Sequence, residues 1–154
     1  MMNERMKLAN AYHDKKFNCA QSVLLAFGDK TGLDEKTARA IAGGMGGGVG
    51  GSHEELCGAI SGGTMVLGMF APFADPQKTE DRRRLYGYVK EFRKRFSQRF
   101  GGLTQCGALL RSRVEPSEEM TPAAVRVGAK KHCDIMVVTA VEIVEQILKE
   151  EGLL

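Results

Sequence analysis

The chain has 154 residues, which is the size of one domain and is long enough to bury a hydrophobic core. It carries a net charge of +3, with 19 glycines and no tryptophan, a composition that suits a globular protein rather than a disordered one. Residues 1–7 are charged and lack the apolar stretch of a secretory signal, which predicts a cytoplasmic protein. Residues 56–73 are uncharged, but their polar and turn-forming members favour a buried helix over a membrane span, so no membrane association is expected.

The first third of the chain is predicted to be helical. Residues 3–15 form the first helix of this prediction. Asn18 and Gln21 then make a capping box, which marks the start of a second helix. One face of that helix carries Cys19, Val23 and Phe27. Asp34 is expected to cap a short third helix that ends at Ala42.

A glycine-rich loop and another helix follow. Residues 43–51 contain seven glycines in nine positions, which excludes a regular helix or a stable strand. Ser52 and Glu55 resemble a second capping box, which predicts a helix through Cys57 to about Phe70. Small residues share one face of this helix, and that face could pack within the chain or against a second copy in a homodimer. They are Gly58, Ala59, Gly62 and Gly63.

The second half of the chain also reads as helices. Asp75 and Pro76 begin a long helix that runs to Phe100, with Leu85, Val89, Phe92 and Phe96 on its apolar stripe. Thr104 caps a short helix that holds Cys106, and residues 117–127 form another. The last helix spans about 129–150, with Cys133, Val137, Val141, Val144 and Leu148 in register. The predicted fold is therefore a single all-α domain, 1–154, a bundle of about six to seven helices with a glycine-rich loop.

Four cysteines are the most informative residues for function. Cys19, Cys57, Cys106 and Cys133 are far apart in sequence, so there is no C-x-x-C and no zinc-knuckle spacing. In the cytoplasm thiols stay reduced, which favours metal ligands or redox thiols over structural disulfides. The alternative is that some of them are small buried hydrophobic residues. Cys57 and Cys106 are each followed by Gly-Ala, which leaves room for a metal, a cluster or a partner thiol.

The predicted helix boundaries place three cysteines near helix starts. Cys19 and Cys106 fall in the first turn and Cys57 within two turns, where the helix dipole favours thiolate over thiol. Cys133 lies on an apolar stripe and is expected to face the core. His53 stands four residues before Cys57 on the predicted helix and could share a metal with it, although a solvated histidine is the commoner outcome.

The glycine-rich loop matches G-x-G-x-x-G at Gly46, Gly48 and Gly51. A dinucleotide site also needs a strand before the loop, and here a helix precedes it, so nucleotide binding is not favoured. The loop N–H groups could instead form a nest for an anion, such as a thiolate or a cluster beside Cys57. Gly46, Gly48, Gly51 and Gly58 are therefore candidate cofactor-binding residues.

Positive charge is concentrated on the long helix. Residues 82–99 carry eight basic side chains against Glu91 alone: Arg82, Arg83, Arg84, Lys90, Arg93, Lys94, Arg95 and Arg99. This pattern is typical of a solvated helix face, and the alternative is a docking surface for an acidic partner. Nucleic acid is not favoured, because no aromatic side chains are interleaved for base stacking.

Several segments together resemble a known family. They are Phe17-Asn18-Cys19-Ala20-Gln21-Ser22-Val23, the glycine run, Cys57-Gly58-Ala59-Ile60-Ser61-Gly62, the segment from Phe100-Gly101-Gly102 to Cys106, and Cys133. The chain resembles the C_GCAxxG_C_C family of small redox-active proteins from residue 17 to about 145, with all four cysteines in the expected order. The resemblance implies that these cysteines carry the function. Because related domains are fused to electron-transfer modules, it also points to a cysteine-bound iron–sulfur cluster.

Three functions follow from these observations. The leading interpretation is a redox protein whose four cysteines form one site for an iron–sulfur cluster or another thiolate-ligated metal, with electron transfer to an unknown redox partner protein. The first alternative is a metal-free thiol–disulfide oxidoreductase that uses cysteine pairs. The second is a module with structural zinc, in which the basic helix is the docking surface.

Overall fold

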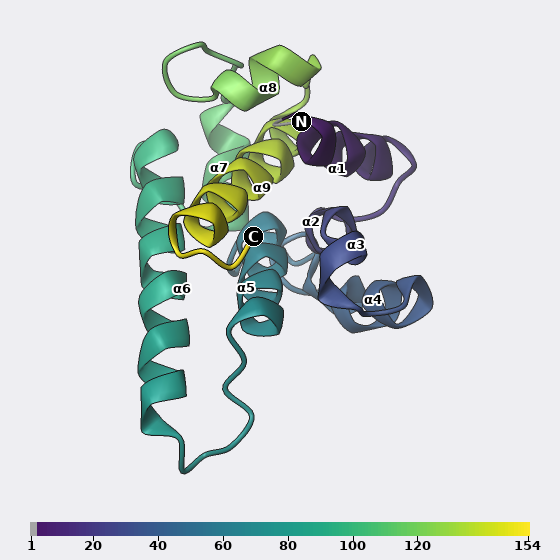
Figure 1. Cartoon of the computed structure of the whole chain (residues 1–154). Coiled ribbons are helices and arrows are strands. Elements are labelled where there is room, and N and C mark those ends of the chain that lie inside the picture. The colour runs from purple at the N-terminus through teal and green to yellow at the C-terminus, as the bar shows by residue number, and fades with distance from the viewer. Residues whose placement is uncertain (1–2) are drawn as a thin grey trace.

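The chain is helical throughout the part that the computed structural model describes, residues 3–154 (Figure 1). This range contains nine α-helices and one short 3₁₀ turn, and no strand. The all-α prediction is therefore confirmed, although the count exceeds the six to seven helices expected. Part of the excess is α3, a single turn from Gly28 to Thr31, which is too short to show any periodicity in sequence.

The helices follow one another in a simple order. They are α1 (Glu4–Asp14), α2 (Cys19–Ala26), α3 (Gly28–Thr31), α4 (Glu35–Ala42), the 3₁₀ turn Gly43–Met45, α5 (Gly58–Phe70), α6 (Thr79–Arg99), α7 (Cys106–Ser112), α8 (Pro122–Val127) and α9 (His132–Glu150). Between the 3₁₀ turn and α5 lies the glycine-rich segment, which forms consecutive turns as its composition predicts.

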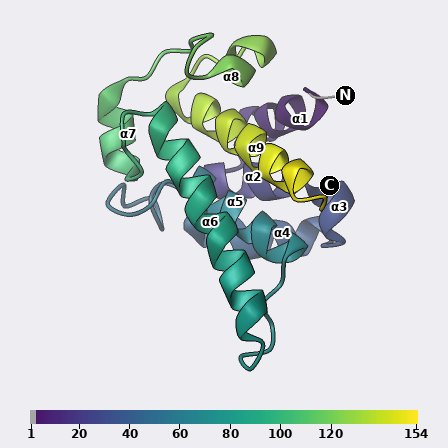
Figure 2. The same ribbon diagram turned by 60° about the vertical axis from the view of Figure 1, so that its left-hand side comes forward.

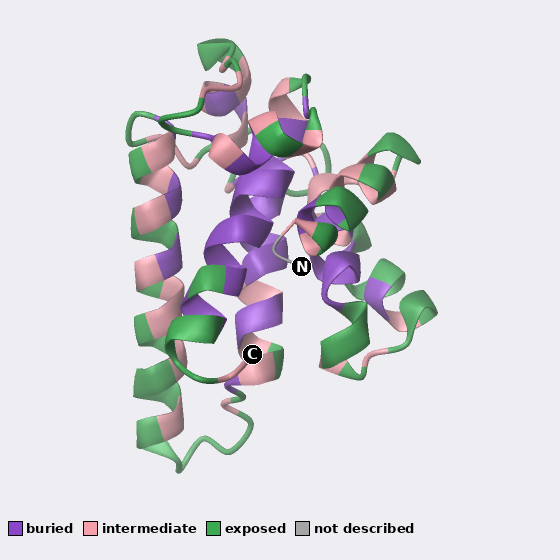
Figure 3. Cartoon of the chain, turned by 45° about the horizontal axis from the view of Figure 1, so that its top comes forward, coloured by how far each residue is buried: buried purple, intermediate pink, exposed green. Residues whose placement is uncertain are grey.

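Two helices form the centre of the molecule. Figure 1 shows α9 running across α5, and α6 standing upright beside both. Every residue of α9 from Asp134 to Glu145 is buried, and Figure 3 shows this helix and α5 largely in the colour of buried residues. A helix that is buried on all sides needs neighbours all around it. Those neighbours are α1, α2, α5, α6, α7 and α8.

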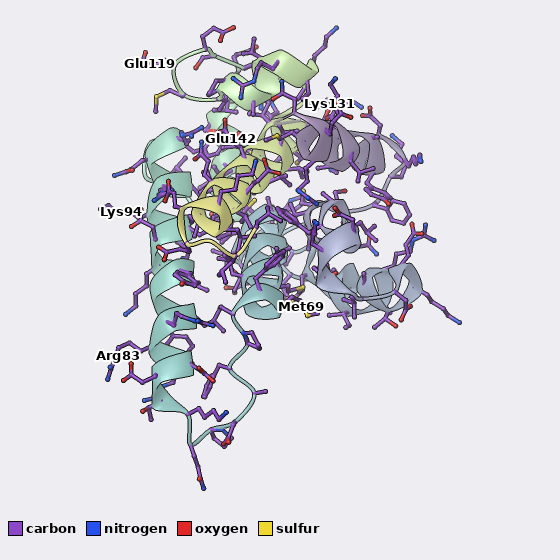
Figure 4. All side chains as sticks on the ribbon, in the orientation of Figure 1. Met69, Arg83, Lys94, Glu119, Lys131 and Glu142 are labelled. Atoms are coloured by element: carbon purple, nitrogen blue, oxygen red, sulfur yellow. The ribbon has the colours of Figure 1, made fainter. Side chains whose placement is uncertain are left out.

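The long helix α6, whose N-terminal end extends beyond the other helices (Figure 2), has an apolar side and a basic side. Phe92, Phe96 and Phe100 are buried in the core as the stripe predicts. Two of its arginines are held by carboxylates of α9, namely Arg95 by Glu150 at 2.8 Å and Arg99 by Glu142 at 2.8 Å. Figure 4 shows Arg83 and Lys94 on the outer side of the same helix, directed away from the core.

Two of the predicted helix caps are confirmed. The side chain of Asn18 accepts a hydrogen bond from the backbone N–H of Gln21, whose side chain in turn accepts from the backbone N–H of Asn18. Asp34 caps α4 by accepting from the backbone N–H of Thr37. Each of these caps involves residues three apart, so local sequence is sufficient to specify it.

Other predicted helix starts are wrong. Asp75 does not cap α6: its side chain accepts from the N–H of Gln77 in a separate turn, and the helix begins at Thr79. The segment predicted as helix over 117–127 is helical only from Pro122. The last helix begins at His132 rather than near residue 129.

The uncharged segment 56–73 is a buried helix, as expected, over Gly58–Phe70. Within residues 3–154, none of the helices combines the length and the apolarity needed to cross a membrane. Met1 and Met2, which belong to the segment considered for a secretory signal, lie outside the described residues.

The small-residue face of α5 packs inside the chain. A Cβ atom placed on Gly62 would lie 2.6 Å from the carbonyl oxygen of Ala20, so this glycine allows α2 and α5 to approach closely. A Cβ on Gly63 would lie 2.5 Å from the ring of Phe92. Packing within the chain, rather than against a second copy, therefore accounts for these residues.

Alanine at Gly62 is expected to destabilise the protein by about 1–3 kcal/mol, because its methyl group would meet the backbone of α2. Gly68 lies on the same helix, and a Cβ added there would meet nothing within 4 Å, so Gly68→Ala should instead stabilise by about 0.5–1 kcal/mol. Urea unfolding of both variants tests this. Equal shifts in the two midpoints would contradict the close α2–α5 approach.

Candidate functional site: a cavity lined by four cysteines

All four cysteines line one small cavity. Cys19, Cys57, Cys106 and Cys133 surround a space of about 60 Å³, and none of them is in a disulfide. The rest of the lining is Gly47, His53, Gly58, Leu109, Leu110 and Met136. Four segments that are distant in sequence are thus brought together. Among the described residues that line the cavity, the four cysteines and His53 are the ones with ionisable side chains.

Each cysteine stands at the start of a different helix. Cys19 and Cys106 are the first residues of α2 and α7, and Cys57 is the N-cap of α5. Cys133 is the second residue of α9, so the expectation that it faces the core from within the helix is corrected: it is half-buried in the first turn. The positive ends of the long helices α5 and α9 therefore point toward the thiols, which favours negative charge on sulfur.

Cys57 and Cys106 are held together by the backbone. The segment around Leu56 pairs with Gln105 in a single antiparallel bridge. On one side the N–H of Cys57 donates to the carbonyl of Thr104 at 2.9 Å, and on the other the N–H of Cys106 donates to the carbonyl of Glu55 at 2.9 Å. This pairing fixes the two cysteines side by side at the cavity.

The same pairing overturns the predicted capping box at Ser52 and Glu55. Residues 52–57 are not helical, and α5 begins only at Gly58. The hydroxyl of Ser52 donates to the carbonyl of Gly48 at 2.6 Å, and His53 has a positive φ of 63°. His53 and Cys57 consequently do not share a helix face, although both line the cavity.

Two of the four candidate glycines pack directly against cysteines of the site, and a third packs against the residue before Cys19. A Cβ on Gly48 would lie 2.6 Å from the Cβ of Cys106, and one on Gly58 would lie 3.1 Å from the Cβ of Cys19. A Cβ on Gly46 would overlap the side chain of Asn18, the residue before Cys19. A Cβ on Gly51 would meet nothing within 4 Å, although the φ of this glycine is +71°. The glycines therefore bring the loop close to the cysteines, and whether they contact a cofactor stays a prediction.

Cys19 and Cys133 line the same cavity and have opposite pKa shifts. The neighbouring Cys19 thiol lowers the pKa of Cys133 to about 6, against burial, which raises it. The neighbouring Cys133, together with burial, raises the pKa of Cys19 well above its ordinary value. Of the two cysteines, Cys133 is therefore the one that is expected to be a thiolate.

The other two cysteines remain protonated at neutral pH. Burial raises the pKa of Cys57 to about 12, although the nearby backbone N–H groups of Ala59 and Ile60 lower it in part. Burial also raises the pKa of Cys106, with a further contribution from Cys133. Only Cys133 is expected to be a nucleophile under physiological conditions.

Alkylation at varied pH tests this assignment. Because its pKa is lowered to about 6, Cys133 is a thiolate above that pH, so its reaction with iodoacetamide should rise through pH 6 and then level off. Cys57 should stay unmodified in the folded protein up to strongly alkaline pH. Mass spectrometry of each labelled peptide measures both rates. A Cys133 rate that still rises above pH 8 would contradict the lowered pKa.

A histidine and an aspartate that the sequence did not single out complete the cluster. His13, near the end of α1, places its Nε2 atom 3.8 Å from the sulfur of Cys19. Its Nδ1 atom hydrogen-bonds the carboxylate of Asp134, the residue after Cys133. The one available signal in the sequence was a carboxylate directly after a cysteine on an apolar helix, which would have to be buried beside the thiol.

The four cysteines are the type of ligand that an iron–sulfur cluster or a zinc ion needs, but their side chains are not grouped as a metal site in this structure. Four cysteine thiols around one cavity are the ligand type that iron–sulfur clusters and zinc prefer. However, in the part of the chain that the structure describes, no three His, Cys, Asp or Glu side chains are grouped so that they could hold a metal ion. The binding of a cluster or a metal by the four cysteines therefore stays a prediction, and the chemistry considered below is that of free thiols.

The basic face of α6 lies next to the Cys106 segment. Lys90, Arg93 and Lys94 are exposed and line a shallow surface hollow of about 320 Å³ together with Ser97, Gly102 and Thr104. None of these three cations forms an ion pair within residues 3–154. The docking of an acidic partner on this face stays a prediction.

Comparison with known proteins gives one match. A family model described as "Putative redox-active protein (C_GCAxxG_C_C)" matches residues 17–147, which includes all four cysteines. No curated protein and no solved structure shows a significant match to the chain.

Proposed function

The chain belongs to the C_GCAxxG_C_C family, and on this premise we propose that it is a thiol–disulfide oxidoreductase in which Cys19 and Cys133 are the reacting pair. The observation that carries the proposal is that these two thiols line one cavity at the starts of α2 and α9 and have opposite pKa shifts, raised for Cys19 and lowered to about 6 for Cys133. A low-pKa nucleophile next to a second thiol is the arrangement that thiol–disulfide exchange requires.

The reaction proceeds in two balanced steps. The Cys133 thiolate attacks one sulfur of a substrate disulfide, so that the substrate S–S bond breaks, a mixed disulfide forms on Cys133 and one substrate thiolate leaves. The sulfur of Cys19 then attacks Cys133, which breaks the mixed disulfide and releases the second substrate thiolate. Two electrons and the proton of Cys19 pass from the protein to the substrate, which leaves as one thiol and one thiolate that takes a proton from water, and the protein ends with a Cys19–Cys133 disulfide.

Two features of the cavity favour this pair over the other thiols. The lining of the cavity is mostly apolar, and in such surroundings the interaction between Cys19 and Cys133 is stronger than it would be in water. Cys57 is 4% exposed and has a strongly raised pKa, so it does not compete for the disulfide. The chemistry is thus confined to the half-buried pair at the starts of α2 and α9.

The test is disulfide mapping combined with metal analysis. Protein purified without oxygen is equilibrated in buffers of defined thiol–disulfide ratio, and its disulfides are mapped by peptide mass spectrometry. A Cys19–Cys133 bond that forms and breaks reversibly, in metal-free protein, supports the proposal. Iron with acid-labile sulfide in matching amounts, or stoichiometric zinc, lost on replacing any one of the four cysteines, would overturn it in favour of a metal site.

A further inference from the structure

His13 is held between the reacting thiol and a buried carboxylate. Its side chain is 17% exposed and that of Asp134 is 8% exposed, so both groups are largely removed from water. The three groups come from α1, α2 and α9, and they form a continuous line from Asp134 through the imidazole ring to the sulfur of Cys19.

Asp134 determines which nitrogen of the His13 ring carries the proton, and so leaves the other nitrogen, which faces the Cys19 thiol, as a hydrogen-bond acceptor. A carboxylate accepts hydrogen bonds only, so the contact at Nδ1 places the ring proton on that nitrogen. In the neutral ring Nε2 then has a free lone pair, and this atom is the one that lies 3.8 Å from Cys19. The imidazole is therefore oriented to take a proton from the thiol.

Nothing else in the described residues competes for Asp134. Its side chain makes no other hydrogen bond in residues 3–154. A buried carboxylate is costly unless it is paired, which keeps His13 and Asp134 together. The carboxylate also stabilises the imidazolium that forms once the proton has moved.

We infer that His13 is the base that removes the proton from Cys19 during its attack on the mixed disulfide at Cys133, with Asp134 as the positioning residue. The inference rests on the proposed exchange reaction and adds the fate of its proton. The proton passes from the sulfur of Cys19 to Nε2 of His13, and from there to the departing substrate thiolate. No further reactant is needed.

Other ionisable groups near this line set the local field. α9 and its N-cap contribute Lys131, His132 and Cys133. Asp14, the last residue of α1, and Lys16, in the turn that follows, lie on the other side. The cavity contributes Cys57 and Cys106. Within residues 3–154, His13 is the one residue whose side-chain nitrogen comes within hydrogen-bonding reach of the Cys19 sulfur.

Two-phase kinetics with dithiodipyridine test the inference. The first release of thiopyridone reports attack by Cys133, and the second reports resolution by Cys19. Cys57→Ala and Cys106→Ala in the background restrict the reaction to the pair. In the His13→Ala variant we expect the second phase to slow by about 10²-fold at neutral pH, while the first phase stays within about twofold, as for loss of a general base.

Two readouts separate a base from a structural residue. The slow second phase of His13→Ala should rise about tenfold per pH unit and should be restored by added imidazole, whereas a residue that only supports the fold would show neither effect. Asp134→Asn, which keeps the size of the side chain, should slow the same phase without rescue by imidazole. His132→Gln is the matched control: the Nδ1 of His132 lies 3.1 Å from the carbonyl of Val114 and not at the Cys19 sulfur, so the second phase should keep the parent rate. Because His132 helps to lower the pKa of Cys133, any change should be confined to the first phase.

The outcomes also distinguish the inference from the proposed function. A second phase in His13→Ala with the rate and pH dependence of the parent protein would overturn the role of His13 and leave the exchange reaction standing. A parent protein that releases thiopyridone without ever forming the Cys19–Cys133 disulfide would overturn the exchange reaction itself.

Discussion

Cys133→Ser is expected to abolish thiol–disulfide exchange, with a loss of at least about a thousandfold in the rate of the first step. A serine hydroxyl remains protonated at neutral pH and cannot replace the thiolate of Cys133, whose pKa the neighbouring Cys19 lowers to about 6. The rate of thiopyridone release from dithiodipyridine measures the effect. The fold should tolerate the change, because Cys133 is only half-buried and serine is smaller.

Two companion variants make this result specific. Cys19→Ser should form the mixed disulfide on Cys133 but never resolve it, which leaves a stable adduct that mass spectrometry detects. Cys106→Ser should react with close to the parent rate, because burial already keeps Cys106 protonated. Equal losses in all the cysteine variants would instead indicate a shared ligand set, and would argue against a reacting pair.

Gly48→Ala is expected to cost about 3 kcal/mol of stability. The φ of Gly48 is +71°, a region that costs a residue with a side chain about 1–2 kcal/mol. In addition its Cβ would lie 2.6 Å from that of Cys106 and 3.1 Å from the backbone of His53, and such crowding costs about 1–3 kcal/mol. Urea unfolding measures the sum, and a displaced Cys106 should also become more reactive toward iodoacetamide.

Gly50→Ala provides the control for backbone strain alone. Gly50 has a φ of +61°, but a Cβ there would meet nothing within 4 Å. Its alanine variant should therefore lose only about 1–2 kcal/mol and leave the reactivity of Cys106 unchanged. If the two variants are equally stable, the contact between the glycine-rich loop and the Cys106 helix is not tight.

The elements that the sequence predicted well depend on short-range interactions. Asn18 with Gln21, and Asp34 with Thr37, are caps that close over three residues, and each begins the predicted helix. The phenylalanine stripe of α6 and the apolar register of α9 follow from helical periodicity alone. The sequence also indicated that the four cysteines could act together only if the fold brought them to one place, because no two of them are close in sequence.

The errors arise where segments that are distant in sequence form hydrogen bonds with the backbone N–H and C=O groups that the predicted helix would have used. Ser52 and Glu55 have the residue types of a capping box, but the carbonyl of Glu55 accepts from the N–H of Cys106, and that of His53 accepts from the N–H of Gly107 at 2.8 Å. These partners lie about fifty positions away, so no local pattern reveals them. The same limit explains why His13 was overlooked: its partners Cys19 and Asp134 meet it only after α1 has packed against α2 and α9.

The central position of α9 also determines when the protein acquires its reactivity. The ribosome adds Cys133 and Asp134 after the other three cysteines, and domains generally fold as units once their chain is available. A nascent chain that has not yet reached residue 130 would carry three cysteines without the partner that makes the pair. The low-pKa thiolate of Cys133 thus arises only when α9 takes its place in the fold.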